Sequence, residues 1–376
     1  MAVAALGLVR PPLHDRAVAG ASEPSSRQTV VAASVTLPAL SAKQMAGQRV
    51  IYSYTGLTPP ASLLRRISYG QAAGVIFFGD NIKSDAQIRA VIKTLEHANA
   101  SSHNPVKAPL LLMTDQEGGL VRRLPGAPLL SEKRIGESAD PLAAARGAGT
   151  RAGRNLRGVG MNVNLAPVLD VYRHPGDFDD QFERSYSRSP SVVSELGSAF
   201  IAAQQKTGVA ATAKHFPGLG AATNVQNTDE RSVTLRVSVG ALRATDEYPY
   251  RAAIAAGVQL VMVSWARYPA LDPGVPAGLS SVVVQDELRG RLGYQGVTIT
   301  DALEAGALKK YGTTEQRATL AAGAGMDLIL CALGHVTQGT QAMLGLRDAY
   351  LGGTLDKTAF RASVQRVVDL RTSLGS

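Results

Sequence analysis

Cysteine is almost absent from this chain, which has one cysteine in 376 residues. Cys331 lies in the apolar segment 328–333, so no disulfide can form within the chain and no cysteine-based zinc site is possible. We expect Cys331 to be a buried thiol rather than a nucleophile. No apolar run approaches the roughly 20 residues of a membrane helix, which predicts that the chain has no integral membrane segment.

Features of nucleic-acid and dinucleotide binding are also missing. Aromatic residues make up 5% of the chain, and no cluster of lysine and arginine or interleaved aromatic pattern occurs. No Gly-x-Gly-x-x-Gly follows an early strand, which argues against a dinucleotide fold. The net charge of +9 favours anionic surroundings such as a cell-wall polymer. We therefore expect no nucleic-acid partner.

The first 38 residues are rich in alanine, serine and proline and lack helical periodicity. They are interpreted as a disordered tail or as the remnant of a secretory signal, because Ala17 to Ala19 resembles a small-residue cleavage site. Residues 39–376 are predicted to form one domain. An extracellular or cell-envelope location is the first expectation, with the cytoplasm as the alternative, and a monomer is favoured.

From residue 49 onward, short apolar and β-branched runs alternate with helical patterns. A serine and proline at Ser189 and Pro190 begin one such helix, in which Val193, Leu196 and Phe200 share a face. Other helices are expected at 61–69, 85–98, 142–156, 239–256, 282–292 and 314–322. Strands are expected at 49–54, 74–78, 110–114, 161–165, 209–213, 259–263, 297–300 and 326–330.

Eight strand and helix units in alternation predict an α/β fold of the (β/α)8 barrel type. A doubly wound open sheet is the alternative. In a barrel, polar residues at the carboxyl ends of the strands are the functional candidates.

Charged residues follow four of the expected strands, namely the third, fourth, fifth and seventh. Asp115 and Glu117 lie two residues apart after the third strand, so their side chains should point the same way. Lys214 and His215 follow the fifth strand. Asp301 follows the seventh, where burying a carboxylate without a partner would be costly.

Two further residues on these loops have side chains suited to sugar binding. Arg184, on the charge-rich loop after the fourth strand, can hold a hydroxyl pair or a carboxylate. Trp265, after the sixth strand, either forms a flat wall for a sugar ring or covers the barrel mouth. Carboxylates, an arginine and a lysine around a barrel mouth fit glycoside hydrolysis. A Schiff-base aldolase using Lys214 is an alternative.

Several motifs resemble those of glycoside hydrolase family 3, and most closely its single-domain β-N-acetylhexosaminidase branch. They are DQEGG from Asp115, APVLD ending at Asp170, RSY from Arg184, KHFPG from Lys214 and GVTITDAL containing Asp301. The resemblance spans residues 40–373. It implies a (β/α)8 barrel, Asp301 as the nucleophile of a retaining mechanism, and sugar-hydroxyl binding by Asp115, Arg184, Lys214 and His215.

The chain departs from this branch in the loop after the fifth strand. The family's general acid/base is usually a histidine in an Asp-Ser-His triplet, but no histidine occurs between His215 and His335. The nearest equivalent is Asn227-Thr228-Asp229. Asp229 is therefore the candidate acid/base, because a carboxyl with a raised pKa performs this task in most glycosidases. Glu230 is a second candidate.

The resemblance therefore implies an exo-acting β-N-acetylhexosaminidase-like hydrolase of terminal β-linked glucosamine-type sugars, with cell-wall fragments in peptidoglycan turnover as a possible substrate. Absence of the family histidine leaves a non-catalytic or weakly active sugar-binding barrel as the alternative, and a β-glycoside phosphorylase as a further one. The chemistry needs no metal and no organic cofactor. The expected partner is a carbohydrate substrate.

Overall fold

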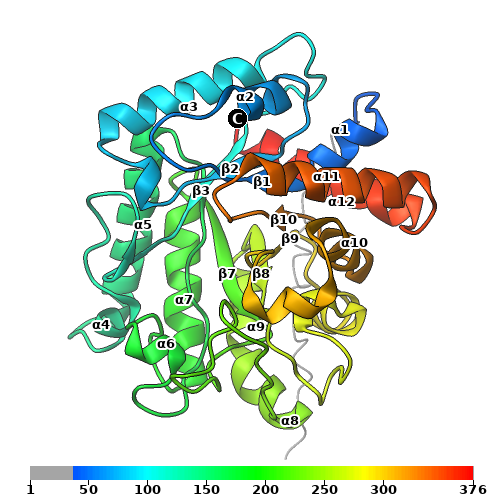
Figure 1. The fold of residues 1–376 in the computed structure, drawn as a ribbon. Helices are drawn as coiled ribbons and strands as arrows, with labels where there is room; N and C mark the ends of the chain where they lie inside the picture. Colours follow the sequence, from blue (N-terminus) through cyan, green and yellow to red (C-terminus); the bar gives the residue numbers. More distant parts are fainter. Residues whose placement is uncertain (1–36, 376) are drawn as a thin grey trace, which may run out of the picture. The chain divides into compact units, whose positions relative to one another are not determined.

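The computed structural model describes residues 37–375, and at its centre lies a parallel eight-stranded sheet (Figure 1). Neighbouring strands follow the chain order, with the last strand next to the first. The strands are β1 (Val50–Tyr52), β2 (Gly74–Ile76), β3 (Leu111–Thr114), β6 (Val163–Asn164), β7 (Ala210–Phe216), β8 (Leu260–Val263), β9 (Val297–Thr300) and β10 (Ile329–Leu330). All eight predicted strands are present, although most are shorter than expected.

The sheet closes into a barrel between β9 and β10. Ile299 forms a parallel bridge with Leu328, and the amide of Thr300 donates to the carbonyl oxygen of Leu328 at 3.0 Å. Apolar side chains from the strands, including Ile51 and Met113, fill the interior. The predicted barrel is confirmed, and the open sheet is wrong because a doubly wound sheet would keep two unpaired edges.

Helices surround the sheet (Figure 1). Proline at the first position of α5 and of α7 fixes a helical φ where no amide partner is needed. The predicted start of α7 at Pro190 is confirmed. The long outer helices are α2 (Ala61–Ser68), α3 (Asp85–Asn99), α5 (Pro141–Val159), α7 (Pro190–Gln205), α9 (Tyr248–Ala255), α10 (Thr314–Ala324) and α11 (Val336–Leu351).

Two predicted helices differ in form from the expectation. The span 239–256 contains α8 (Val239–Ala241), a π-helical turn (Leu242–Asp246) and α9. Pro249 has no amide hydrogen, so one regular helix cannot run through this position. The span Val282–Arg291 is π-helical rather than α-helical. Both remain helical crossovers on the outside of the barrel.

A final helix, α12 (Lys357–Ser373), covers the amino-terminal end of the barrel, and the sequence pattern did not identify it. Val367 and Leu370 pack with the side chains of the barrel interior. Arg371 is buried and donates to the carbonyl oxygens of Ala108 and Pro109, both 2.8 Å away, just before β3. The open end of the barrel is therefore the opposite one, where the strands end.

Three predictions about composition have different outcomes. Cys331 is a buried free thiol, as expected. Among the helices of residues 37–375, none has the length and apolar character to cross a membrane. The prediction of a tail or signal remnant falls almost wholly on residues 1–36, which lie outside the described part of the chain.

Candidate active site

The charged residues predicted at the strand ends lie at the carboxyl-terminal mouth of the barrel. Asp115 follows β3 directly, before a short hairpin formed by β4 (Gln116–Gly118) and β5 (Val121–Arg122). Asp301 follows β9 directly. Strand β7 continues beyond the predicted end at residue 213, so Lys214 and His215 belong to the strand itself.

These residues line one cavity of about 410 Å³. Its wall includes all six residues that the sequence selected, and also Glu117, Arg123 and Phe182. The six are Asp115, Arg184, Lys214, His215, Asp229 and Asp301. Residues that are up to 186 positions apart in the sequence are therefore brought to one pocket.

Lys214 is buried between two carboxylates. Its Nζ lies 2.8 Å from Asp115 Oδ1 and 2.7 Å from Glu117 Oε1. Burial alone would lower the pKa of this ammonium, but the charges of Asp115 and Glu117 outweigh it and raise the pKa. Lys214 is thus a fixed cation. An aldolase lysine must lose its proton to attack a carbonyl, so this environment opposes the Schiff-base alternative.

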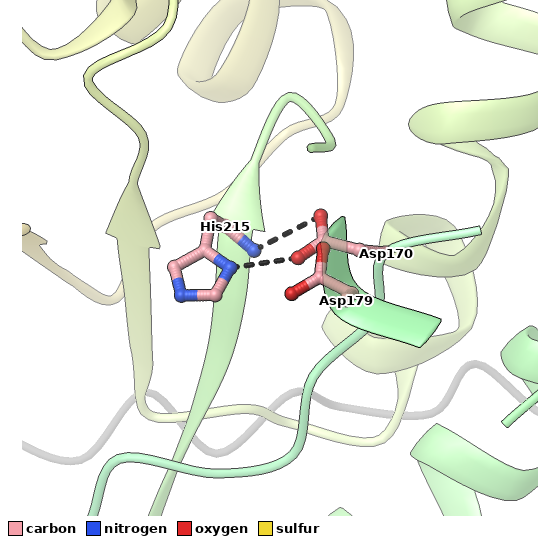
Figure 2. A group of neighbouring side chains, drawn as sticks. All are labelled: Asp170, Asp179 and His215. Carbon is pink, nitrogen blue, oxygen red and sulfur yellow. Dashed lines mark hydrogen bonds and ion pairs between the residues drawn. The ribbon is translucent and has the colours of Figure 1, made fainter. Parts of the chain in front are cut away.

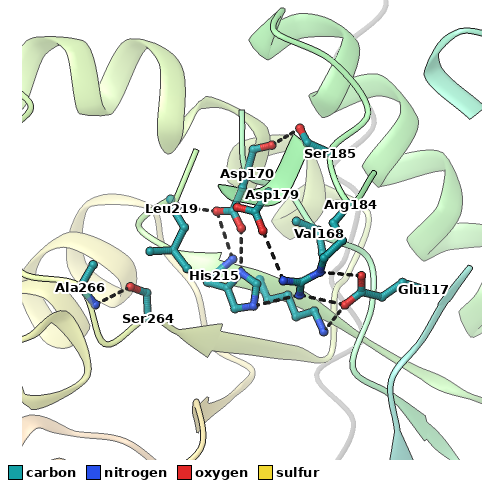
Figure 3. A network of polar contacts seen from close by, with 12 residues as sticks. Glu117, Val168, Asp170, Asp179, Arg184, Ser185, His215, Leu219, Ser264 and Ala266 are labelled. Atoms are coloured by element: carbon teal, nitrogen blue, oxygen red, sulfur yellow. Dashed lines mark hydrogen bonds and ion pairs between the residues drawn. The ribbon is translucent and has the colours of Figure 1, made fainter. Parts of the chain in front are cut away.

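Arg184 and Glu117 form a two-pronged ion pair (Figure 3). The Nε and Nη2 atoms of Arg184 donate to Glu117 Oε2 and Oε1 at 2.9 and 3.0 Å. Burial would raise the pKa of Glu117, but Arg184 and Lys214 lower it to about 2. Glu117 is therefore ionised and holds both cations at the floor of the cavity. The N–H groups of Lys214 and Arg184 that do not bind Glu117 remain available to a ligand in the cavity.

His215 is held by Asp170, which follows β6 (Figure 2). His215 Nδ1 lies 2.7 Å from Asp170 Oδ2, and the amide of Leu219 donates to Asp170 Oδ1 at 2.6 Å. Burial and the charge of Arg184 lower the pKa of His215 to about 4. The ring is therefore neutral at neutral pH. With Nδ1–H donated to Asp170, Nε2 is an acceptor at the cavity wall, where its contact with Arg184 Nη2 is long at 3.5 Å.

Asp179 lies next to Asp170 and His215 and completes a cluster of three titratable side chains. Burial and the charge of Asp170 raise the pKa of Asp179 to about 7, and burial raises that of Asp170 to about 6. Ligand atoms of Asp170, Asp179 and His215 lie within 4.8 Å of one another, a spacing that a metal could use. However, Arg184 Nη1 lies 3.3 Å from Asp179 Oδ1 and its Nη2 lies 3.5 Å from His215 Nε2. A guanidinium cation thus already contacts two of the three groups, so the donor set does not suit a metal cation.

Asp301 lines the same cavity as these ion pairs. The amide of Ala302 donates to Asp301 Oδ1 at 2.7 Å. Burial, and after it the charge of Asp229, raise the pKa of Asp301. Trp265 does not line the cavity. Its ring is fully buried, and Nε1 donates to the carbonyl oxygen of Ala302 at 2.8 Å, so it supports the loop that carries Asp301.

The loop that carries Asp229 is fastened to the loop after β9. The amides of Gly306 and Ala307 donate to the carbonyl oxygens of Asp229 and Thr228 at 2.7 and 3.0 Å. A Cβ at Gly306 would lie 2.1 Å from the carbonyl oxygen of Glu230, so this contact requires glycine. Asp229 is thereby fixed relative to the strand that carries Asp301.

Asp229 and Glu230 are both exposed residues, but only Asp229 lines the cavity. Partial burial of its carboxyl raises the pKa of Asp229 against the charge of Arg184, and Glu304 adds to the rise. Glu230 is exposed and paired with Arg231 at 3.0 Å, and it does not line the cavity. The structure therefore removes Glu230 as the second acid/base candidate, because adjacent side chains on this turn point apart.

Three residues of the network were not assigned a role from the sequence. Glu117 was noted beside Asp115 at a strand end, whereas nothing local distinguished Asp170 and Asp179 from solvated loop carboxylates. Each is almost fully buried against a cation or an imidazole. The usable signal was position, since Glu117 and Asp170 follow apolar strands closely.

The chain matches the profile of "Glycosyl hydrolase family 3 N terminal domain" over residues 42–370. It is 46% identical over 331 residues to an "Uncharacterized secreted glycosyl hydrolase" of Arthroderma benhamiae, covering 88% of this chain and 93% of that one. It is 35% identical over 276 residues to a "Beta-hexosaminidase" of Nitrosomonas eutropha, covering 70% and 75%. A family 3 β-N-acetylglucosaminidase structure from Paenibacillus superposes with a TM-score of 0.83 at 34% identity, covering 90% of this chain and 64% of that chain.

Proposed function

Because the chain belongs to glycosyl hydrolase family 3, it is a glycoside hydrolase, and we propose that it removes terminal β-linked N-acetylhexosamine residues. The names of the Nitrosomonas and Paenibacillus relatives support this sugar. We infer that Asp301 is the nucleophile and that Asp229 is the general acid/base.

One observation carries the proposal: two carboxyl groups, Asp301 and Asp229, line one cavity, and the charge of Asp229 raises the pKa of Asp301. Retaining glycosidases need one carboxylate that attacks and one carboxyl that supplies a proton. A pair of acids whose environments differ provides both states at one pH. The loop of Asp229 thus supplies the group that the missing histidine would otherwise provide.

The surroundings of the two carboxyl groups support this division of roles. The Ala302 amide donates to Asp301, and the cation of Lys214 favours its ionised form. No donor from residues 37–375 contacts the carboxyl of Asp229, and burial, with the charges of Glu304 and Asp115, raises its pKa against the opposing charge of Arg184. We assign the negative charge to Asp301, whose carboxylate accepts from a backbone amide, and the transferable proton to Asp229, whose carboxyl opens to the cavity.

The reaction then has two steps. Asp301 attacks the anomeric carbon while Asp229 gives its proton to the glycosidic oxygen, so the leaving group departs as an alcohol and a glycosyl-aspartate ester forms. Asp229, now ionised, takes a proton from water. The resulting hydroxide attacks the anomeric carbon, breaks the ester and releases Asp301. The β configuration is retained because each step inverts it once.

The remaining cavity groups bind the terminal sugar. Asp115 accepts from sugar hydroxyls, Lys214 and Arg184 donate to them, and His215 Nε2 accepts. Glu117 and Asp170 do not contact the sugar directly but hold these donors and acceptors in place. Buried, preformed partners of this kind reject substrates that lack the matching hydroxyl.

An extracellular or cell-envelope location, with cell-wall fragments as substrate and a monomeric enzyme, completes the proposal. The Arthroderma relative is described as secreted. The net charge of +9 also suits an anionic wall.

The experiment compares wild type, Asp301→Asn and Asp229→Asn on an aryl β-N-acetylglucosaminide with a good leaving group and on the corresponding disaccharide. Asp301→Asn should abolish both activities, and a fluorosugar should label Asp301 in wild type. Asp229→Asn should lower disaccharide hydrolysis by roughly 10²- to 10⁴-fold and aryl glycoside cleavage far less. Equal rates for Asp229→Asn and wild type would remove Asp229 as the acid.

The same panel tests the two alternatives. A protein that binds the disaccharide with no Asp301-dependent turnover would be a sugar-binding barrel. A rate that rises with inorganic phosphate and gives a sugar phosphate would identify a phosphorylase. The pairing of Lys214 and Arg184 with carboxylates speaks against phosphate at the cavity floor.

A further inference from the structure

Phe182 is an aromatic side chain on the wall of the active-site cavity that the proposed mechanism does not use. It directly follows the short helix α6 (Phe178–Gln181) and is 42% exposed. Single exposed apolar residues are common on protein surfaces and need no explanation. This one differs because it borders the cavity and because the backbone of the next residue is held in a strained conformation.

The next residue, Glu183, is the one described residue other than glycine with a positive φ, at 56°. This conformation is unfavourable for a residue that has a Cβ, so surrounding contacts must enforce it. The Glu183 amide donates to Asp180 at 2.9 Å, its carbonyl oxygen accepts from the Lys133 amide at 3.2 Å, and Ser131 Oγ donates to its carboxylate at 2.8 Å. The turn that presents Phe182 is therefore fixed from three sides.

The ring of Phe182 also has a fixed neighbour. It contacts Phe178 edge to face, with centroids 5.7 Å apart and the planes at 78°. Phe178 lines the same cavity and its amide donates to the carbonyl oxygen of Ala222. The edge contact leaves a face of Phe182 without an aromatic partner among the described residues.

Phe182 lies where the leaving group of the substrate would pass. Arg184, two residues later, reaches the cavity floor and pairs with Glu117. The terminal sugar binds at that floor in the proposed mechanism. An exo-acting enzyme holds one sugar there, so the rest of the substrate must pass the exposed rim, where Phe182 lies.

We propose that Phe182 forms the platform of a leaving-group subsite, and that its ring stacks on the apolar C–H face of the sugar next to the bond that is cleaved. This inference rests on the proposed function. Aromatic rings combine a large apolar area with few rotatable bonds, so a ring fixed in advance binds a sugar face with little loss of entropy. The ligand is thus a second pyranose, rather than a peptide or lipid.

The test compares two substrates with the same terminal sugar. A β-linked disaccharide of N-acetylglucosamine presents a sugar as leaving group, whereas N-acetylglucosaminyl fluoride presents one atom. Phe182→Ala should lower kcat/KM for the disaccharide by about threefold to tenfold, the range of a single aromatic contact, and leave the fluoride unchanged. Phe182→Tyr should retain the disaccharide rate. Leu320→Ala, at an apolar residue on α10 with 46% exposure, is the control and should change neither rate.

An equal loss on both substrates, or no loss on either, would overturn the subsite. A binding measurement separates this outcome from failure of the proposed function. In the Asp301→Asn background, Phe182→Ala should weaken binding of the disaccharide but not of N-acetylglucosamine in calorimetry. If wild type lacks turnover yet this difference persists, the hydrolase mechanism fails and the subsite stands. Equal affinities of the two proteins for the disaccharide would overturn the subsite.

Discussion

Glu117 is the carboxylate that both buried cations of the site contact. Its two carboxylate oxygens accept hydrogen bonds from Arg184, and Oε1 also lies 2.7 Å from Lys214 Nζ. Removing one partner of a buried ion pair leaves an uncompensated charge, which commonly destabilises a protein by about 3–5 kcal/mol. We therefore expect Glu117→Gln to lower the free energy of unfolding by about 3 kcal/mol at pH 7 and to raise KM, because Lys214 and Arg184 lose their fixed positions.

The pH dependence of that loss has a defined sign. The pKa of Glu117 is about 2 when folded, below its ordinary value of 4.5, so its stabilisation is present above pH 4.5 and disappears as the pH falls toward 2. Urea denaturation at pH 7 and pH 3 should show a smaller difference between wild type and Glu117→Gln at the lower pH. Glu137→Gln, in an exposed pair with Arg134, is the control and should have little effect. A difference independent of pH would contradict the assignment.

Individual site residues could be predicted where a charged residue directly follows a single apolar strand. Asp301 and Lys214 stood out because each follows apolar residues that a barrel buries. The partners of these residues could not be predicted, because Glu117 and Asp170 act across 97 and 45 sequence positions on Lys214 and His215 respectively. Such pairings depend on barrel register, which a single sequence does not specify.

At the scale of elements, the loop after β7 and the loop after β9 work as a pair. Gly306 allows the backbone of residues 228–230 to lie against the loop that follows Asp301. Gly306→Ala would force a Cβ to within 2.1 Å of the Glu230 carbonyl oxygen, so the Asp229 loop must move. A displacement near 1 Å can reduce a catalytic rate by about 10²-fold. We expect disaccharide kcat to fall roughly 10- to 100-fold.

Substrates with good leaving groups provide the internal check on Gly306→Ala. They need little proton donation, so their rates should fall much less if only Asp229 has moved. Gly240→Ala is the matched control, since a Cβ there meets no atom within 4 Å. Equal losses on both classes of substrate would indicate a general disturbance of the cavity rather than a displaced acid.

The elements themselves were largely predictable. Short β-branched runs identified all eight barrel strands, because a strand buried on both faces is apolar along its length. The pattern failed for the end of β7, whose last residues are charged, and it did not identify α11 or α12. The apolar face of α12 is interrupted by arginines. It also left the role of Trp265 open, because the local sequence does not distinguish a buried tryptophan that supports a loop from an exposed one that lines the cavity.

For the whole molecule, the two ends of the barrel have separate tasks. The carboxyl-terminal mouth holds the cavity, while α12 covers the amino-terminal end with Val367 and Leu370. This division is typical of (β/α)8 enzymes, in which the carboxyl-terminal face carries the catalytic residues and the amino-terminal face contributes to stability. Substitutions at the covered end should therefore change stability without changing the chemistry.

Arg371 offers the sharpest test of that separation. Its buried guanidinium donates to Ala108, Pro109 and the side chain of Gln48, and so joins the last helix to residues just before β1 and β3. Arg371→Met would leave these acceptors unpaired, at about 1–3 kcal/mol each, so we expect the thermal midpoint to fall by at least about 6 °C. Arg361→Met, on the exposed face of the same helix, should shift it by less than about 2 °C. Because Arg371 lies at the end opposite the cavity, kcat of the folded variant at 25 °C should equal that of wild type, and a reduced kcat would show that the two ends are coupled.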